Sequence, residues 1–293
     1  MRKEFAALFI LLIVSAARGD DEPAMIWVAE GDNNRVYLMG SIHMLREQDH
    51  PLPGIVDTVY DDAEKLVMEI DMDDIDPLAA LQFLMQEGVL QGDTTLKDFM
   101  GASLYAEAKA SAAEIDIPIE MLEKSEPWLA AMTVQEMIMM RIGFKAEFGI
   151  EMYLMAKASA DGKPITGLET IEQQLGFLDG LSPDTQSRWL LQSIVEGRRM
   201  EMLTDEMVAA WRGGDVQFLE RELLVEMDTY PELHDALLAD RNKSWITPIM
   251  NMLDDRDDYL VIVGAAHLVG DDGVPDLLSK QGVRIKQLHE SLR

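Results

Sequence analysis

The chain has 293 residues and is 48% hydrophobic, which is enough to bury the core of one large domain or two small ones. Its formal net charge is −29, from 54 acidic and 25 basic residues, and this argues against nucleic acid and anionic membrane surfaces as partners because both would repel it. The absence of Cys excludes disulfides, a thiolate nucleophile and a lipid-modified N-terminal cysteine.

The N-terminus has the order of segments found in a secretory signal peptide. Arg2 and Lys3 precede an apolar run over 5–14, and small residues at 15–17 precede the acidic residues 20–22. We predict a signal peptide over 1–19 with cleavage between 16 and 19, and a periplasmic or secreted protein. A retained signal anchor is the alternative, but the apolar run is shorter than the ~20 residues that a membrane span needs. No transmembrane span is expected after signal removal.

The rest of the chain places strands near both ends and helices between them. The turn residues 31–34 between apolar-rich runs at 25–30 and 35–39 predict a β-hairpin. A helix over 53–62 and a buried strand over 65–70 follow, and 77–148 has helical periodicity with breaks. A helix over 149–160, a strand over 164–168 and a helical region over 171–253 come next. The chain then closes with a strand over 259–263, a helix over 274–280 and a strand over 283–288. We therefore predict an α/β (α+β) fold, with a central mixed sheet built from both ends of the chain and a large helical middle region. It forms a single domain over 20–293 with a helical insertion at about 77–160.

Two strands end in the same short motif. The run 35–39 leads into Gly40-Ser41-Ile42-His43, and the run 259–263 leads into Gly264-Ala265-Ala266-His267. A glycine lets the backbone turn tightly or approach a ligand, and ligands of open α/β sheets bind at strand ends. One such motif would be ordinary loop sequence. Two copies at opposite ends of the chain, using two of its five histidines, favour a site that His43 and His267 share.

Three further residues are candidates for the same site. Glu69 and Glu169 end apolar strands, where a carboxylate can serve as a metal ligand or proton acceptor. Arg241 follows a helical run and could clamp a carboxylate or stabilise an oxyanion, although a cation at a helix end is also common without a function. His50, His234 and His289 are assigned no role. No nucleophile elbow, His-Glu-x-x-His helix, phosphate loop or dinucleotide fingerprint occurs.

These motifs together resemble those of the TraB/GumN family. The matching segments are Gly40–His43, Glu69, 162–174, Arg241-Asn242 and 264–270, and they cover nearly all of the mature chain. That family is related to the Tiki metalloproteases and more distantly to erythromycin-esterase-like and haem-binding ChaN-like proteins. In one place the chain departs from the family, since a helix that often opens Gly-x-Asp opens here with Gly149-Ile150-Glu151.

The resemblance implies an exported metal-dependent hydrolase, a Tiki-like peptidase acting on a peptide or protein substrate. His43 and His267 would bind a divalent ion (Mn, Co or Zn), Glu69 or Glu169 would complete the site, and Arg241 would stabilise developing negative charge. One alternative is a non-catalytic ligand-binding or envelope-assembly protein of the same fold. Another is a metal-free, esterase-like hydrolase that uses a histidine as general base. Substrate and oligomeric state do not follow from the sequence.

Overall fold

The computed structural model describes residues 24–72, 74–224 and 227–288. The predicted signal peptide lies outside the described residues. Within the described ranges, none of the helices combines the length and apolarity that a bilayer crossing requires.

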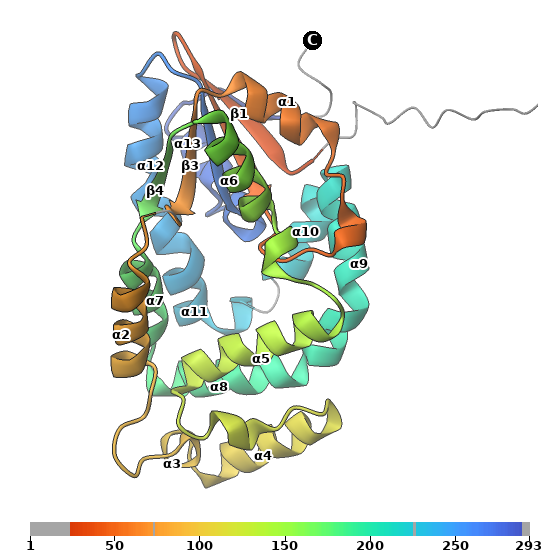
Figure 1. The fold of residues 1–293 in the computed structure, drawn as a ribbon, viewed down its shortest axis with the longest axis vertical. Coiled ribbons are helices and arrows are strands. Elements are labelled where there is room, and N and C mark those ends of the chain that lie inside the picture. The colour runs from red at the N-terminus through yellow and green to blue at the C-terminus, as the bar shows by residue number, and fades with distance from the viewer. Residues whose placement is uncertain (1–23, 73, 225–226, 289–293) are drawn as a thin grey trace, which may run out of the picture.

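One six-stranded mixed sheet forms the centre of the molecule, with the strand order β4-β3-β5-β2-β1-β6 (Figure 1). The strands are β1 Ile26–Glu30, β2 Arg35–Ser41, β3 Lys65–Ile70, β4 Ile165–Glu169, β5 Tyr259–Gly264 and β6 Ile285–Gln287. Strands β4, β3, β5 and β2 run parallel, whereas β1 pairs antiparallel with both β2 and β6. The predicted hairpin is β1–β2, and the two strands of the Gly-x-x-His motifs, β2 and β5, are direct neighbours.

The composition of the strands follows from their places in the sheet. All six residues of β5 are buried, because helices cover both faces of a central parallel strand. Strand β4 lies at the edge, and Thr166 and Gly167 in it are exposed. The register pairs Ser41 with Gly264, so the two motifs leave the sheet side by side.

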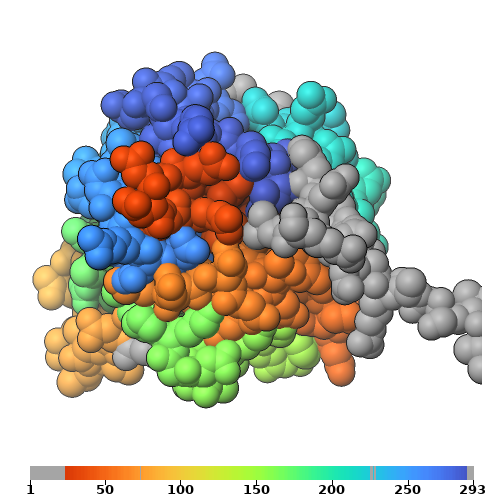
Figure 2. Space-filling view, turned by 90° about the horizontal axis from the view of Figure 1, so that it is seen from above, coloured from red at the N-terminus to blue at the C-terminus, as the bar shows by residue number. Residues whose placement is uncertain are grey.

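Helices fill the predicted middle region and cover the sheet. They are α1 Gly54–Asp62, α2 Pro77–Glu87, α3 Leu96–Met100, α4 Ala102–Glu114, α5 Pro127–Arg141, α6 Ile150–Asp161, α7 Ile171–Asp179, α8 Pro183–Val195, α9 Gly197–Gly213, α10 Val216–Leu224, α11 Pro231–His234, α12 Asp240–Leu253 and α13 Val274–Lys280. The predicted fold class is therefore confirmed. Figure 2 shows residues from both ends of the chain side by side on one face, as a sheet built from both ends requires.

The buried apolar residues form two clusters. The first surrounds the sheet and includes Ile150 and Leu154 of α6. The second lies among helices α3–α5, α7 and α8 and includes the fully buried Trp128 and Leu190. The second cluster therefore combines helices that precede β4 in the sequence with helices that follow it. Helix α6 packs in the first cluster, with the sheet. Helices α5 and α8 pack together in a layer below the end of the sheet at which the parallel strands finish (Figure 1).

Candidate functional site

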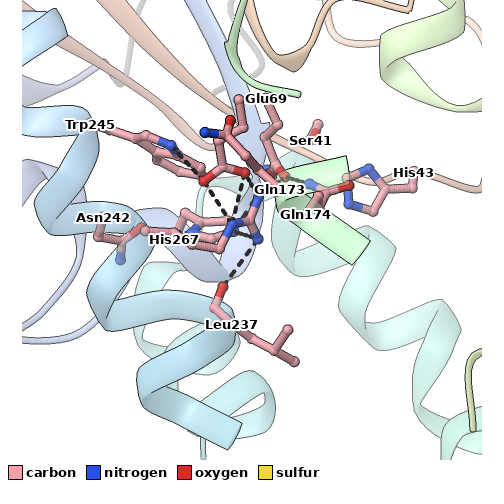
Figure 3. Close-up of polar contacts among 12 residues, drawn as sticks. Ser41, His43, Glu69, Gln173, Gln174, Leu237, Asn242, Trp245 and His267 are labelled. Carbon is pink, nitrogen blue, oxygen red and sulfur yellow. Dashed lines mark hydrogen bonds and ion pairs between the residues drawn. The ribbon is translucent and has the colours of Figure 1, made fainter. Parts of the chain in front are cut away.

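The five residues predicted from the sequence meet at the carboxyl end of the parallel strands. Figure 3 shows His43, Glu69 and His267 there. Glu69 and Glu169 stand at the ends of β3 and β4. His43 follows β2, and His267 lies in the short 3-10 helix Ala265–Leu268 that follows β5. Arg241 reaches them from the first turn of α12. Parallel strands bring these ends to one edge, although the residues are far apart in the chain.

Gly264 lies where three of these side chains converge. A Cβ atom at this position would lie 3.3 Å from Glu69 Oε1, 3.5 Å from His43 Nε2 and 3.6 Å from His267 Cδ2. The two imidazoles are therefore neighbours. The Gly264 N–H donates to Glu69 Oε1 at 2.7 Å. Glycine keeps this space open and lets the backbone approach the carboxylate.

Arg241 is buried at the centre of a hydrogen-bond network and uses all of its N–H groups. Nε donates to both oxygens of Glu169, and Nη2 donates to Glu69 Oε2 at 2.6 Å and to Glu169 Oε2 at 2.9 Å. Nη1 donates to the Leu237 carbonyl and to His267 Nε2, both at 3.1 Å. Because a guanidinium has five N–H donors, none is left for a substrate oxyanion. The predicted carboxylate clamp is present, and the carboxylates that it holds belong to the protein.

The two glutamates have different surroundings. Glu169 also accepts a hydrogen bond from Trp245 Nε1 at 3.0 Å, and its side chain is 5% exposed. The side chain of Glu69 is 11% exposed, and its Oε1 faces His43 across Gly264. Gln174 of α7 donates to Glu69 Oε2 at 2.8 Å. Glu169 therefore positions Arg241, and Glu69 is the carboxylate that faces His43.

His267 is held in one tautomer. Its Nδ1 lies 2.6 Å from Asn242 Oδ1, and its Nε2 accepts from Arg241, so the proton is assigned to Nδ1. Burial lowers the pKa of His267 to about 3, and the neighbouring Arg241 acts in the same direction. The imidazole is neutral at physiological pH and stacks obliquely on Trp245 at 4.5 Å between ring centroids.

His43 has the opposite character. Its Nδ1 lies 2.7 Å from Glu151 Oε1 of α6, and Ser41 Oγ donates to the same oxygen. The Glu151 carboxylate raises the pKa of His43 to about 9, so the ring is an imidazolium at neutral pH. Its side chain is 66% exposed, which leaves Nε2 accessible from the open side of the site.

The Gly149-Ile150-Glu151 segment explains how α6 supplies this carboxylate. A Cβ atom on Gly149 would lie 2.1 Å from the His43 carbonyl oxygen, so only glycine allows α6 to begin here. The Ile150 N–H donates to the Ile42 carbonyl at 3.2 Å, which joins the helix to the loop of the first motif. Glu151 then lies in the first turn, where the helix dipole favours an anion. A glutamate thus fills the position at which the family often has aspartate.

Glu69 is held ionised although it is buried. Burial raises the pKa of Glu69, but His267, Arg241, His43 and the Gly264 N–H outweigh it and lower the pKa to about 2. Because His267 is neutral at physiological pH, the charges that stabilise this carboxylate there are those of Arg241 and of protonated His43.

The residues as placed do not fit a single metal ion shared by both histidines. His267 presents Nε2 to a guanidinium N–H and Nδ1 to Asn242, so neither nitrogen offers a lone pair to an ion. Across the part of the chain that the structure describes, no group of three His, Asp or Glu side chains is arranged to hold a metal. The metal assignment for His43 and His267 stays a prediction, and it requires Arg241 Nη1 to leave His267.

The fold and site define an α/β protein with a buried arginine–glutamate network beside a His–Glu pair, at the carboxyl end of parallel strands. The model of the TraB/PrgY/gumN family matches residues 25–287, and the chain belongs to this family. It is 28% identical over 254 residues to the uncharacterized protein YbaP of Escherichia coli K12, which covers 84% of this chain and 88% of YbaP. An uncharacterized protein of Treponema pallidum is 22% identical over 270 residues, which covers 88% of this chain and 80% of that protein. No solved structure matches the chain significantly.

Sequence reasoning alone did not assign roles to Gln174, Asn242, Trp245 and Glu151. Asn242 and Gln174 lie inside segments that carry the family resemblance, which was a signal for both. Trp245 lies four residues after Arg241, on the same face of α12. Glu151 lies at the departure from the family pattern, and it carries the same negative charge as the aspartate that the family often has there.

Proposed function

We propose that this protein is a hydrolase of acyl bonds in which Glu69 accepts a proton from water and His43 donates one to the leaving group. The observation that carries the proposal is the convergence of Glu69 Oε1 and His43 Nε2 on the space beside Gly264, 3.3 Å and 3.5 Å from the position of a Cβ atom there. The pKa of Glu69 is lowered to about 2, and that of His43 is raised to about 9. These shifts keep Glu69 ionised and His43 protonated, which are the states that a proton acceptor and a proton donor need.

The proposed reaction takes place beside Gly264. A water molecule between Glu69 Oε1 and the substrate loses a proton to the carboxylate as its oxygen attacks the carbonyl carbon. The tetrahedral intermediate collapses when the bond to the leaving group breaks and His43 Nε2–H supplies the proton that this group needs. The products are a carboxylic acid and an amine or alcohol. Arg241 does not touch the substrate, and its role is to keep Glu69 ionised and correctly oriented.

The resemblance to Tiki proteases favours a peptide or protein as the substrate, and it implies a divalent ion. The ion stays a prediction, because both ring nitrogens of His267 are already hydrogen-bonded. The proposed reaction does not depend on the ion. The N-terminal segment supports export to the periplasm or beyond, where a peptidase would meet envelope or extracellular proteins. The competing proposal is that the protein keeps this fold but has no catalytic activity, and acts as a ligand-binding or envelope-assembly protein.

The test is hydrolysis of a peptide library and of chromogenic esters by the purified mature chain. Each assay is run after chelation and again with added manganese, cobalt or zinc. We expect turnover after chelation, with His43→Ala and Glu69→Gln each reducing it by at least about 100-fold, the typical contribution of acid–base groups. His289→Ala is the control, because the proposal assigns that residue no role. The double variant should be hardly slower than either single variant, since residues that act as a unit are not additive.

Two results would overturn this mechanism. Turnover that disappears on chelation and returns with one metal would make the protein a metal-dependent hydrolase, and stoichiometric metal in the purified chain would support that outcome. If His43→Ala and Glu69→Gln match His289→Ala in every assay, the competing binding function is favoured.

A further inference from the structure

A cavity lies behind His267, on the side away from His43. It has a volume of about 430 Å³ and is lined by residues of α10, the segment 234–242 and the segment 266–272. Asn242 forms part of its wall. Figure 3 shows Asn242 and His43 on opposite sides of His267. The cavity is therefore next to the candidate site but separate from the acid–base pair.

Asn242 connects this cavity to His267. Its Oδ1 faces His267 Nδ1 at 2.6 Å, and its Nδ2 donates to the Asp272 carbonyl at 2.8 Å. Asn242 is 1% exposed, so both hydrogen bonds are buried and fix its orientation. A ligand in the cavity would contact the residue that sets the tautomer of His267.

The lining has an apolar wall and an acidic rim. Leu224, Leu238 and Val269 supply the wall, and Glu220, Asp271 and Asp272 supply three carboxylates. Among the described residues, no Lys or Arg forms an ion pair with Asp271 or Asp272. The nearby Lys280 binds the Asp276 carboxylate at 2.6 Å and the Asp271 carbonyl at 2.8 Å.

The two basic side chains of the lining do not balance these carboxylates. Arg221 Nε donates to Glu222 Oε1 at 2.8 Å, and its guanidinium lies over the Phe218 ring at 5.0 Å. His234 Nδ1 lies 3.6 Å from Asp235 Oδ1. Each of the two has its own acidic neighbour, so the cavity remains negative. The net charge of the whole chain, −29, adds to the attraction for cations.

We infer that this cavity binds an organic cation, an aliphatic chain that ends in an ammonium or guanidinium group. The chain would pack on the leucine and valine side chains, and the charged end would lie among the rim carboxylates. Charge-assisted hydrogen bonds of this kind are the strong ones, and apolar walls with a few placed polar groups are typical of ligand sites. The inference does not depend on the hydrolase proposal.

The test is calorimetric titration of the full mature chain with agmatine and with butylurea, an uncharged relative. We expect agmatine to bind and butylurea to bind at least about tenfold more weakly, since a charged hydrogen bond contributes roughly 1.5–3 kcal/mol. Asp271→Asn combined with Asp272→Asn should weaken the binding of agmatine by a similar factor. Glu220→Gln on α10 should weaken this binding independently. The control combines Asp32→Asn with Asp93→Asn, exposed residues that remove the same charge elsewhere.

Binding of agmatine should also shift the imidazole NMR signals of His267, and it should persist in His43→Ala. Persistence there separates this inference from the hydrolase proposal, because that variant removes turnover and leaves the cavity intact. Three results would overturn the inference: equal binding of agmatine and butylurea, no binding of agmatine, or equal loss in the rim and control variants. The last would indicate only a general attraction to an acidic surface.

Discussion

Replacing Arg241 with methionine tests the network at the centre of the site. The guanidinium is 6% exposed and holds Glu69 and Glu169, which are 11% and 5% exposed. Arg241→Met keeps most of the volume and leaves two buried carboxylates without their cation. Loss of one partner of a buried ion pair costs about 3–5 kcal/mol.

The lowered pKa of Glu69 gives an upper bound for the share of Arg241, because His267, His43 and the Gly264 N–H lower this pKa together with it. A folded-state value of about 2 lies well below the 4.5 of a free glutamate, and the difference corresponds to about 3 kcal/mol of stability at neutral pH. This stability is present above the unfolded pKa and is lost as the pH falls through the folded one. The wild-type chain should therefore lose its advantage over Arg241→Met as the pH falls from about 4.5 towards 2.

Thermal and urea unfolding at several pH values measure both effects. At pH 7 we expect Arg241→Met to lower the melting temperature by roughly 6–20 °C, given about 2–4 °C per kcal/mol for a chain of this size. The melting temperature of Arg241→Lys should lie between those of the wild type and Arg241→Met, because an ammonium keeps the charge but cannot make the same fork of hydrogen bonds. Arg188→Met is the control, since this exposed arginine pairs with an exposed Asp184. The reasoning is refuted if Arg241→Met costs no more than Arg188→Met, or if its cost is the same at pH 3 and pH 7.

Three further predictions concern catalysis, the α6 contact and export. The rate of hydrolysis should be independent of pH between about pH 2 and about pH 9 and should fall outside that range. Glu151→Gln should move the upper limit down towards the ordinary pKa of histidine, because Glu151 is the main cause that raises the pKa of His43. An upper limit that does not move would contradict the role assigned to His43. Gly149→Ala should lower both stability and turnover in unfolding and rate assays, because its Cβ would meet the His43 carbonyl, whereas Gly176→Ala, with open space around it, should retain both. Mass spectrometry of the protein from the cell envelope should show loss of about the first 16–20 residues, and recovery of intact Met1 in the cytoplasm would count against export.

Local sequence patterns predicted the elements and five residues of the candidate site. Apolar runs predicted the strands that carry the two Gly-x-x-His motifs, and residue spacing predicted the helices between them. Glu69 and Glu169 stood out because each ends such a run. Once these strands are parallel, their ends must share one edge, so local pattern was enough to bring these residues together.

The chemical character of each of these residues depends on contacts that exist only in the folded chain. The partner of His43 is Glu151, 108 positions away, and no local pattern encodes a contact over that separation. Packing of α12 beside the sheet buries Arg241 and occupies all of its donors, so it clamps two of the protein's own carboxylates and leaves no N–H for an oxyanion. The two histidines have the same sequence frame but opposite pKa shifts, because one is buried against a cation and the other is paired with an anion. Burial and charge environment arise from the assembled chain, and they separate two residues that the sequence presents as equivalent.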